Sequence, residues 1–224
     1  MNIPTELPVN RGKRGDLPVK DSILDKTSAL LEHMVSKHGK VLPVRFDVRY
    51  PEDTIAPGDN KDISRMMAKL RQNYARRGCD PHFIWAREQK DSPNPHYHCA
   101  LFLNGNKVRS FGHVFENAER LWGSTIDSIA PGLIERCMKG PSPYGRDHGT
   151  PTEQRENNNK REDMSRNNGI LIVRADTDFE DKYRQVHHQI SYLAKANSKA
   201  EPKDGLRDFG MSRISQKKTR NNNE

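Results

Sequence analysis

Apolar residues recur at helical spacing in four segments of this 224-residue chain. The first segment predicts a helix that begins at Asp21 and stops at Gly39. The other three segments are residues 60–77, 113–128 and 178–197, and Gly78 ends the helix predicted for residues 60–77. In the second segment the apolar positions expected to face inward are Ile63, Met66, Met67 and Leu70.

Between these segments the pattern changes to that of strands. Residues 44–50 alternate Val, Phe, Val and Tyr with charged residues, which predicts a half-buried strand ended by Pro51. Residues 82–88 and 95–103 are joined by a short polar link and predict an antiparallel pair, and residues 169–173 predict a fourth strand. The order β-α-β-β-α-β-α predicts an α+β fold, an antiparallel sheet of split βαβ (ferredoxin- or RRM-like) topology with helices packed on it. Such a sheet supports many functions.

The domain organisation follows from where the periodic pattern is absent. Residues 1–20 predict a flexible N-terminal arm, residues 21–213 one domain, and residues 214–224 a polar basic tail. Residues 140–168 are rich in Gly, Pro, Asn and charge, and are too long for an ordinary connection. They are predicted to be a mobile insert, either disordered or functional.

Charge favours a polyanionic partner. The net charge is +8, 30% of residues are charged and only 33% are hydrophobic, with mean hydropathy −0.98. Nucleic acid is the first candidate, and five cations on the outer side of the second helix are the expected DNA-binding residues. They are Lys61, Arg65, Lys69, Arg76 and Arg77.

Location is predicted to be the cytoplasm of a bacterial cell. No run of about 18 apolar residues is present and the first residues lack the apolar region of a signal peptide, so no membrane partner is expected. The cysteines Cys79, Cys99 and Cys137 have no CxxC spacing, which favours a reducing compartment.

The strongest candidate for a metal-binding or catalytic segment is Pro95-His96-Tyr97-His98, which leads into an apolar strand. His96 and His98 project from one strand face, about 6 to 7 Å apart along the chain. With a carboxylate from Glu88 on the preceding strand they could bind one divalent cation. The alternative is two polar residues at the exposed start of a strand.

The last helix contains a second candidate. Phe179, Tyr183, Val186 and Ile190 share one apolar stripe, so Tyr183 is predicted to lie in the core. Tyr192 lies off that stripe near Lys195, where a nucleophile or a phosphate contact could be placed. A tyrosine that attacks a phosphodiester forms a covalent phosphotyrosine, and a cation beside it stabilises negative charge. The alternative is a half-exposed tyrosine among solvated lysines.

These segments resemble those of the HUH endonucleases, the rolling-circle replication initiators. Residues 46–51 are similar to a first-strand motif that ends in Tyr-Pro, and here they contain one extra residue. The His96–His98 segment with Glu88 resembles the metal motif, and Tyr192 with Lys195 resembles the Tyr-x-x-Lys nucleophile motif. Four short sequence segments resemble one particular family more specifically, the inovirus gene-two-product-like family, also known as the YagK/YfjJ C-terminal domain. They are residues 85–89, 94–98, 191–195 and 209–213.

The resemblance implies an HUH-type endonuclease fold and a specific activity. The enzyme would nick single-stranded DNA at a replication origin of a phage, prophage or related mobile element. Tyr192 and Lys195 would be catalytic, and Glu88, His96 and His98 would bind Mg²⁺ or Mn²⁺. A 5′-phosphotyrosine would form, and the free 3′-OH would serve a host polymerase. The sequence contains no P-loop, so unwinding would need a host helicase.

Three other functions fit parts of the pattern. A prophage regulator would keep the sheet and the charge without nicking DNA, although it would not need the imidazoles, carboxylate, tyrosine and lysine together. An RRM-like sheet would stack RNA bases on aromatic residues, but the RNP pattern is absent. A zinc hydrolase would use His96 and His98 with water as the nucleophile. His188 shares the face of Tyr192 and either orients it or is solvated.

Overall fold

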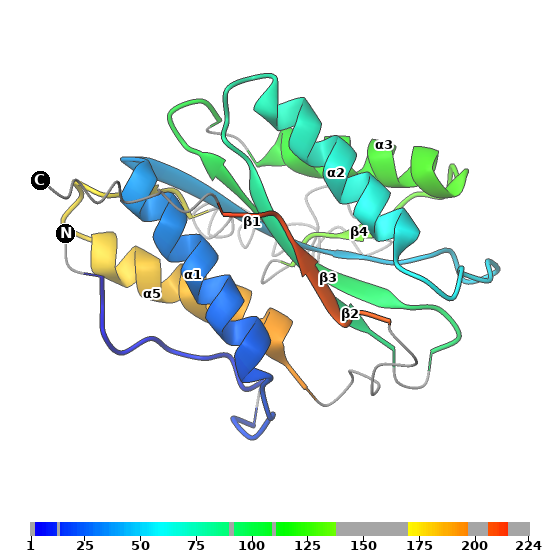
Figure 1. Ribbon diagram of the computed structural model, residues 1–224, viewed down its shortest axis with the longest axis horizontal. Coiled ribbons are helices and arrows are strands. Elements are labelled where there is room, and N and C mark those ends of the chain that lie inside the picture. The colour runs from blue at the N-terminus through cyan, green and yellow to red at the C-terminus, as the bar shows by residue number, and fades with distance from the viewer. Residues whose placement is uncertain are drawn as a thin grey trace, which may run out of the picture.

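Within the described residues, six strands form one antiparallel sheet with helices on both faces (Figure 1). The structure is a computed structural model that describes residues 3–12, 14–89, 92–108, 111–137, 170–196 and 206–214. The helices are α1 (Asp21–Lys37), α2 (Lys61–Ala75), α3 (Gly112–Ile126), α5 (Phe179–Ser191) and the 3₁₀ turn η1 (Tyr192–Ala194). The strands are β1 (Lys40–Val48), β2 (His82–Glu88), β3 (His96–Asn104), β4 (Ile134–Glu135), β5 (Ile172–Val173) and β6 (Phe209–Met211).

The sheet order is β4-β1-β3-β2-β6, and β5 pairs with the other end of β1. The α+β class and the antiparallel pairing of β2 with β3 are confirmed. The predicted fourth strand exists as the shorter β5, whereas β4 and β6 were not predicted. In the central register Asp47 lies opposite His98, and Glu88 lies opposite His96.

Two separate hydrophobic clusters lie on the two faces of the sheet. Even-numbered residues of β1 pack with α2 and α3, including the four residues predicted to face inward from α2. The other face packs against α1 and α5 through residues such as Val41, Ile84 and Phe102. Because strand side chains alternate between faces, residues 45, 47, 88, 96 and 98 all belong to the α1/α5 face.

The prediction of a half-buried β1 is wrong. Its residues are buried on both faces, and the strand ends at Val48 rather than Tyr50. Helices cover both faces of the sheet, so the polar alternation in this strand does not mark a solvent face. Asp47 is only 6% exposed, and a buried carboxylate needs partners that satisfy its charge.

The described residues of the N-terminal segment, which was predicted to be a flexible arm, pack against the end of α5 and against η1. The Asn10 amide donates to Ser191 Oγ at 2.8 Å, and the Lys20 amide donates to Ala194 O at 2.7 Å. Pro8 O accepts a hydrogen bond from His187 Nδ1 at 2.9 Å. These contacts hold the turn that carries Tyr192.

Two predicted segments lie largely beyond what the structure describes. Residues 140–168 fall outside the described residues, and only Ile214 of the tail falls within them. Across the described part of the chain, the helices are too short or too polar to cross a bilayer.

Candidate functional site

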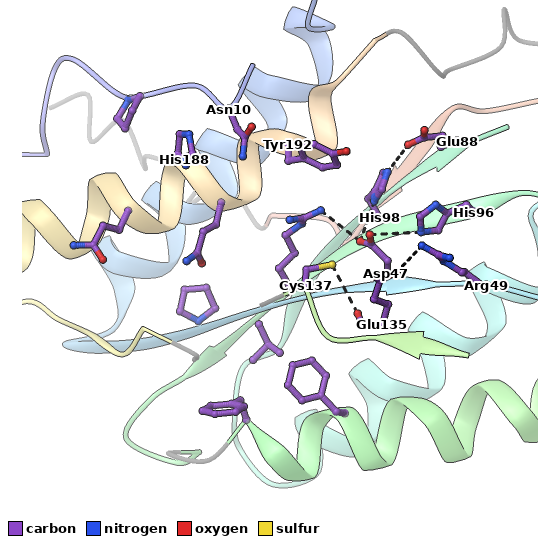
Figure 2. A pocket seen from close by; sticks show the side chains of 18 of the residues that line it. Asn10, Asp47, Arg49, Glu88, His96, His98, Glu135, Cys137, His188 and Tyr192 are labelled. Atoms are coloured by element: carbon purple, nitrogen blue, oxygen red, sulfur yellow. Dashed lines mark hydrogen bonds and ion pairs between the residues drawn. The ribbon is translucent and has the colours of Figure 1, made fainter. Parts of the chain in front are cut away.

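Two imidazoles and a carboxylate converge at one end of the sheet, on the face covered by α5. Asp47 comes from β1, and His96 and His98 come from β3. One ligand atom from each residue lies within 4.8 Å of the others. Figure 2 shows the three side chains pointing toward one another. They line an open cavity of about 770 Å³.

The donor atoms of this group fit a metal ion. Asp47 Oδ1 lies 2.9 Å from His98 Nδ1, and Asp47 Oδ2 lies 3.5 Å from His96 Nε2. Asp47 Oδ1, His96 Nε2 and His98 Nδ1 are buried and lack a hydrogen-bond partner of good geometry among the described residues. Ligands about 2.1 Å from one cation are separated by roughly 3.0 to 3.5 Å. Unsatisfied buried atoms at such separations are typical of a coordination site.

The electrostatics of the group keep Asp47 ionised. Burial alone would raise the pKa of the Asp47 carboxyl, but interactions with His96 and His98 outweigh burial and lower it. Burial lowers the pKa of His98, while Asp47 and Glu88 raise it to a net value above the ordinary one. The two carboxylates therefore create a negative environment that attracts a proton or a cation to His98.

Glu88 contacts the group from its other side. Glu88 Oε2 lies 2.5 Å from His98 Nε2, and Lys195 Nζ donates to Glu88 Oε1 at 3.2 Å. Glu88 was predicted to be the carboxylate ligand of the metal. In the structure, the carboxylate of the three-residue group comes from Asp47. Glu88 already bridges a histidine and a lysine. A carboxylate that receives the second ring N–H of a ligating histidine orients that ring.

Tyr192 lies directly beside this group. Its ring packs edge-on against His98 with centroids 5.2 Å apart, and the Arg45 guanidinium lies 4.6 Å from the ring centroid. Lys195 Nζ donates to the Tyr192 hydroxyl at 3.3 Å. Burial lowers the pKa of Lys195, but Glu88 and Tyr192 raise it to a net value above the ordinary one, so Lys195 is protonated at neutral pH.

The helix does not continue through Tyr192 as predicted. α5 ends at Ser191, and Tyr192 begins η1. The side chain still points to the site, and Tyr192 and Lys195 remain in contact. Tyr183 is 1% exposed and packs in the α1/α5 core cluster, which confirms its predicted core position.

The sequence reasoning missed Asp47 and Arg45 as site residues. Both belong to the charged positions that alternate along β1, but they were interpreted as a solvent-facing stripe. Cys137 was also missed. It lines the cavity, and burial raises the pKa of its thiol. The signal for Asp47 was a carboxylate between the apolar residues Phe46 and Val48 of a strand, since buried strands rarely contain a carboxylate without a partner.

The predicted DNA-binding residues lie on the opposite side of the sheet. They belong to α2 and the turn after it, and α2 packs against the face that is shared with α3 (Figure 1). Lys61 pairs with Asp59 at 2.7 Å, and Arg65 pairs with Asp62 at 3.9 Å. Their role in DNA binding remains a prediction, but their location separates them from Tyr192.

Comparison with known proteins identifies the family. The model of the YagK/YfjJ C-terminal domain matches residues 8–128, so the chain belongs to that family. The chain is also similar to the protein named "Uncharacterized protein YagK" of Escherichia coli (strain K12). They are 26% identical over 209 residues, which cover 84% of this chain and 91% of the relative. No solved structure shows significant similarity.

Proposed function

We propose that this protein is a metal-dependent single-stranded DNA endonuclease in which Tyr192 is the nucleophile. Its role would be to start rolling-circle replication of a phage, prophage or related mobile element. The observation that carries the proposal is one continuous set of contacts at the end of the sheet. Tyr192 contacts Lys195, Lys195 pairs with Glu88, and Glu88 and Asp47 flank His98.

The arrangement of the sheet supports an HUH-type fold. α2 connects β1 to β2, β3 lies between these two strands, and α3 follows β3. The short strands β4 and β5 pair with the outer edge of β1. This order is compatible with the predicted split βαβ topology, in which two histidines of the central strand would face a nucleophile from a later segment.

The reaction would proceed by transfer of a phosphoryl group to Tyr192. The tyrosine oxygen attacks the phosphorus, the bond from phosphorus to the 3′ oxygen breaks, and the 5′ end becomes linked to tyrosine. Tyr192 loses one proton and the departing 3′ oxygen gains one, so the step balances. Lys195 and Arg45 would stabilise the negative charge on the phosphate. The reverse reaction, with a new 3′-OH, would rejoin the strand.

Asp47, His96 and His98 would hold the metal. Two imidazoles and one carboxylate suit a transition ion such as Mn²⁺ better than Mg²⁺, for which oxygen ligands are preferred. A bound divalent ion would polarise a phosphate oxygen and stabilise charge in the transition state. A host helicase and polymerase would supply unwinding and synthesis.

Incubation with single-stranded oligonucleotides from the neighbouring replicon and Mn²⁺ tests the proposal. The expected product is a covalent protein–DNA adduct that denaturing electrophoresis resolves and mass spectrometry locates on Tyr192. Tyr192→Phe should abolish the adduct, while Tyr183→Phe, in the core, should retain it and chiefly affect stability. Cleavage by Tyr192→Phe would instead indicate a hydrolase that uses water, and binding without any cleavage would indicate a DNA-binding regulator.

A further inference from the structure

The exposed face of α5 forms one wall of the cavity beside Tyr192. Gln185, His188, Gln189 and Tyr192 are spaced i, i+3, i+4 and i+7, so they form one stripe opposite the buried stripe of this helix. All four line the cavity. Figure 2 shows His188 and Tyr192 along the same side, with the metal group beyond Tyr192.

The two glutamine amides are available to a ligand. Both residues are exposed, and no hydrogen bond within the described part of the chain engages either side-chain amide. Gln189 lies about 4.5 Å, and Gln185 about 10 Å, from Tyr192 along the helix axis. A side-chain amide offers a donor and an acceptor together, which is the pattern that reads the edge of a nucleobase.

The remaining walls are suited to a planar group. Pro43 of β1 and Phe111 before α3 contribute apolar surface, and Asn10 of the N-terminal segment adds another amide. The volume of about 770 Å³ falls in the range of roughly 300 to 1,000 Å³ found for small-ligand pockets. The cavity combines this apolar surface with amides and with charged side chains such as Arg45 and Arg184. Such a mixed lining favours an unpaired base rather than a paired one, because a duplex hides the edges and faces of its bases.

We propose that this cavity is a base-recognition subsite for one unpaired nucleotide next to the phosphate that Tyr192 attacks. Gln185 and Gln189 would hydrogen-bond the edge of the base, while the phosphate lies at the Tyr192 end. The inference rests on the proposed function because it takes single-stranded DNA as the ligand. It adds a specificity determinant that lies outside the metal group and the nucleophile.

Selection from a pool of single-stranded oligonucleotides with randomised sequence tests the subsite. Tyr192→Phe serves as the reference protein because, under the proposed function, it should bind DNA without cutting it. The bound fraction is sequenced. The expected result is an enriched sequence in the reference protein. Adding Gln185→Ala and Gln189→Ala should remove the preference at one or two adjacent positions, where discrimination falls by about tenfold or more. Preference elsewhere in the sequence should remain.

Gln72→Ala is the matched control, since Gln72 is an exposed glutamine of α2 on the other side of the sheet. It should leave the enriched sequence unchanged. An unchanged preference in the Gln185/Gln189 variant, or no preference in the reference protein, would overturn the subsite. Failure of the proposed function is a different result, in which the wild-type protein forms no adduct with the selected sequence.

Discussion

Asp47 and His98 face each other across adjacent strands, with Asp47 Oδ1 2.9 Å from His98 Nδ1. The residues are separated by 51 positions in the sequence, and the antiparallel register of β1 and β3 brings them together. Their exposures are 6% and 2%. This pairing identifies Asp47, rather than Glu88, as the carboxylate of the candidate metal group.

Asp47→Asn should weaken Mn²⁺ binding by about 100-fold or more, because it removes a charged ligand from a buried site. Glu88→Gln should weaken it by roughly tenfold, because Glu88 orients His98 from outside the group. Isothermal titration calorimetry measures both. Glu116→Gln is the matched control, since its carboxylate pairs with His113 at 3.0 Å on the exposed surface of α3. A larger loss in Glu88→Gln than in Asp47→Asn would assign the ligand to Glu88.

The elements with strong periodicity were predictable from the sequence. The spacing of Tyr183 in α5 identified a core position, and the alternation of His96 and His98 placed both on one face. Local patterns carry this information because helices and strands repeat with fixed periods. The same kind of pattern predicted that one side of α2 packs inward and that its charged side faces outward.

The rest depended on contacts between distant segments. The strand register decides which residue lies opposite His98, and no local pattern reports it. β4 and β6 have two and three residues and exist through pairing with β1 and β2. α5 ends at Ser191, where the N-terminal segment donates to the serine hydroxyl. Periodicity likewise did not tell which face of the sheet α2 covers.

A pH-dependent loss of stability is expected from His82. Burial lowers the pKa of His82 from 6.5 to about 4, so the folded state keeps this ring neutral. Below pH 6.5 the unfolded chain binds a proton that the folded protein does not, and stability falls until the pH reaches about 4. The contribution between pH 7 and pH 5 is about 2 kcal/mol.

Urea unfolding of the wild type and of His82→Asn at the two pH values measures this effect. The variant should lose less stability than the wild type on acidification, whatever its stability at pH 7. His113→Asn is the control, because the His113 side chain is 80% exposed. An equal pH dependence in wild type and His82→Asn would contradict the assignment.

Gly210→Ala should disturb the pairing of β6 with β2. Gly210 lies opposite Trp85, and an added Cβ would come within 2.5 Å of the indole ring. Because Trp85 is 4% exposed, the ring has little room to move. We expect a loss of roughly 1 to 3 kcal/mol in thermal unfolding. Gly58→Ala, where no atom lies within 4 Å of the added Cβ, should be close to neutral.

A double-mutant cycle with Trp85→Leu identifies the cause. The smaller side chain should cancel much of the cost of Gly210→Ala, because it removes the ring that the Cβ would meet. Additive effects of the two substitutions would show that the ring contact is not responsible.

DNA affinity should weaken steeply with salt if the cations of α2 and its C-terminal turn contact phosphates. Replacing Arg76 and Arg77 with Gln should reduce the slope of log affinity against log salt by about 0.7 per cation. Fluorescence anisotropy with a labelled single strand measures the slope. Lys37→Gln on α1, where Lys37 pairs with Asp80 at 2.8 Å, is the control. An unchanged slope would place the DNA footprint away from α2, in keeping with its distance from Tyr192.

Lys195 should act on the chemical step rather than on metal binding. Its ammonium contacts the Tyr192 hydroxyl at 3.3 Å and Glu88 at 3.2 Å, which leaves it close to any phosphate that Tyr192 attacks. Lys195→Gln should therefore slow formation of the adduct by about 100-fold or more, the usual cost of losing one donor that stabilises developing charge. Lys195→Arg should retain part of the rate because it keeps the charge.

Single-turnover rates of adduct formation, measured beside Mn²⁺ affinity, separate the two roles. Lys182→Gln is the matched control, since Lys182 is an ion-paired lysine of α5, 3.0 Å from Asp178, and should form the adduct at the wild-type rate. If Lys195→Gln lost Mn²⁺ affinity in proportion to its rate, the lysine would act by holding Glu88 against His98. A wild-type rate in Lys195→Gln would remove it from the mechanism altogether. We expect the rate to fall while Mn²⁺ affinity stays within a few-fold of wild type, because Glu88 retains His98 as a partner.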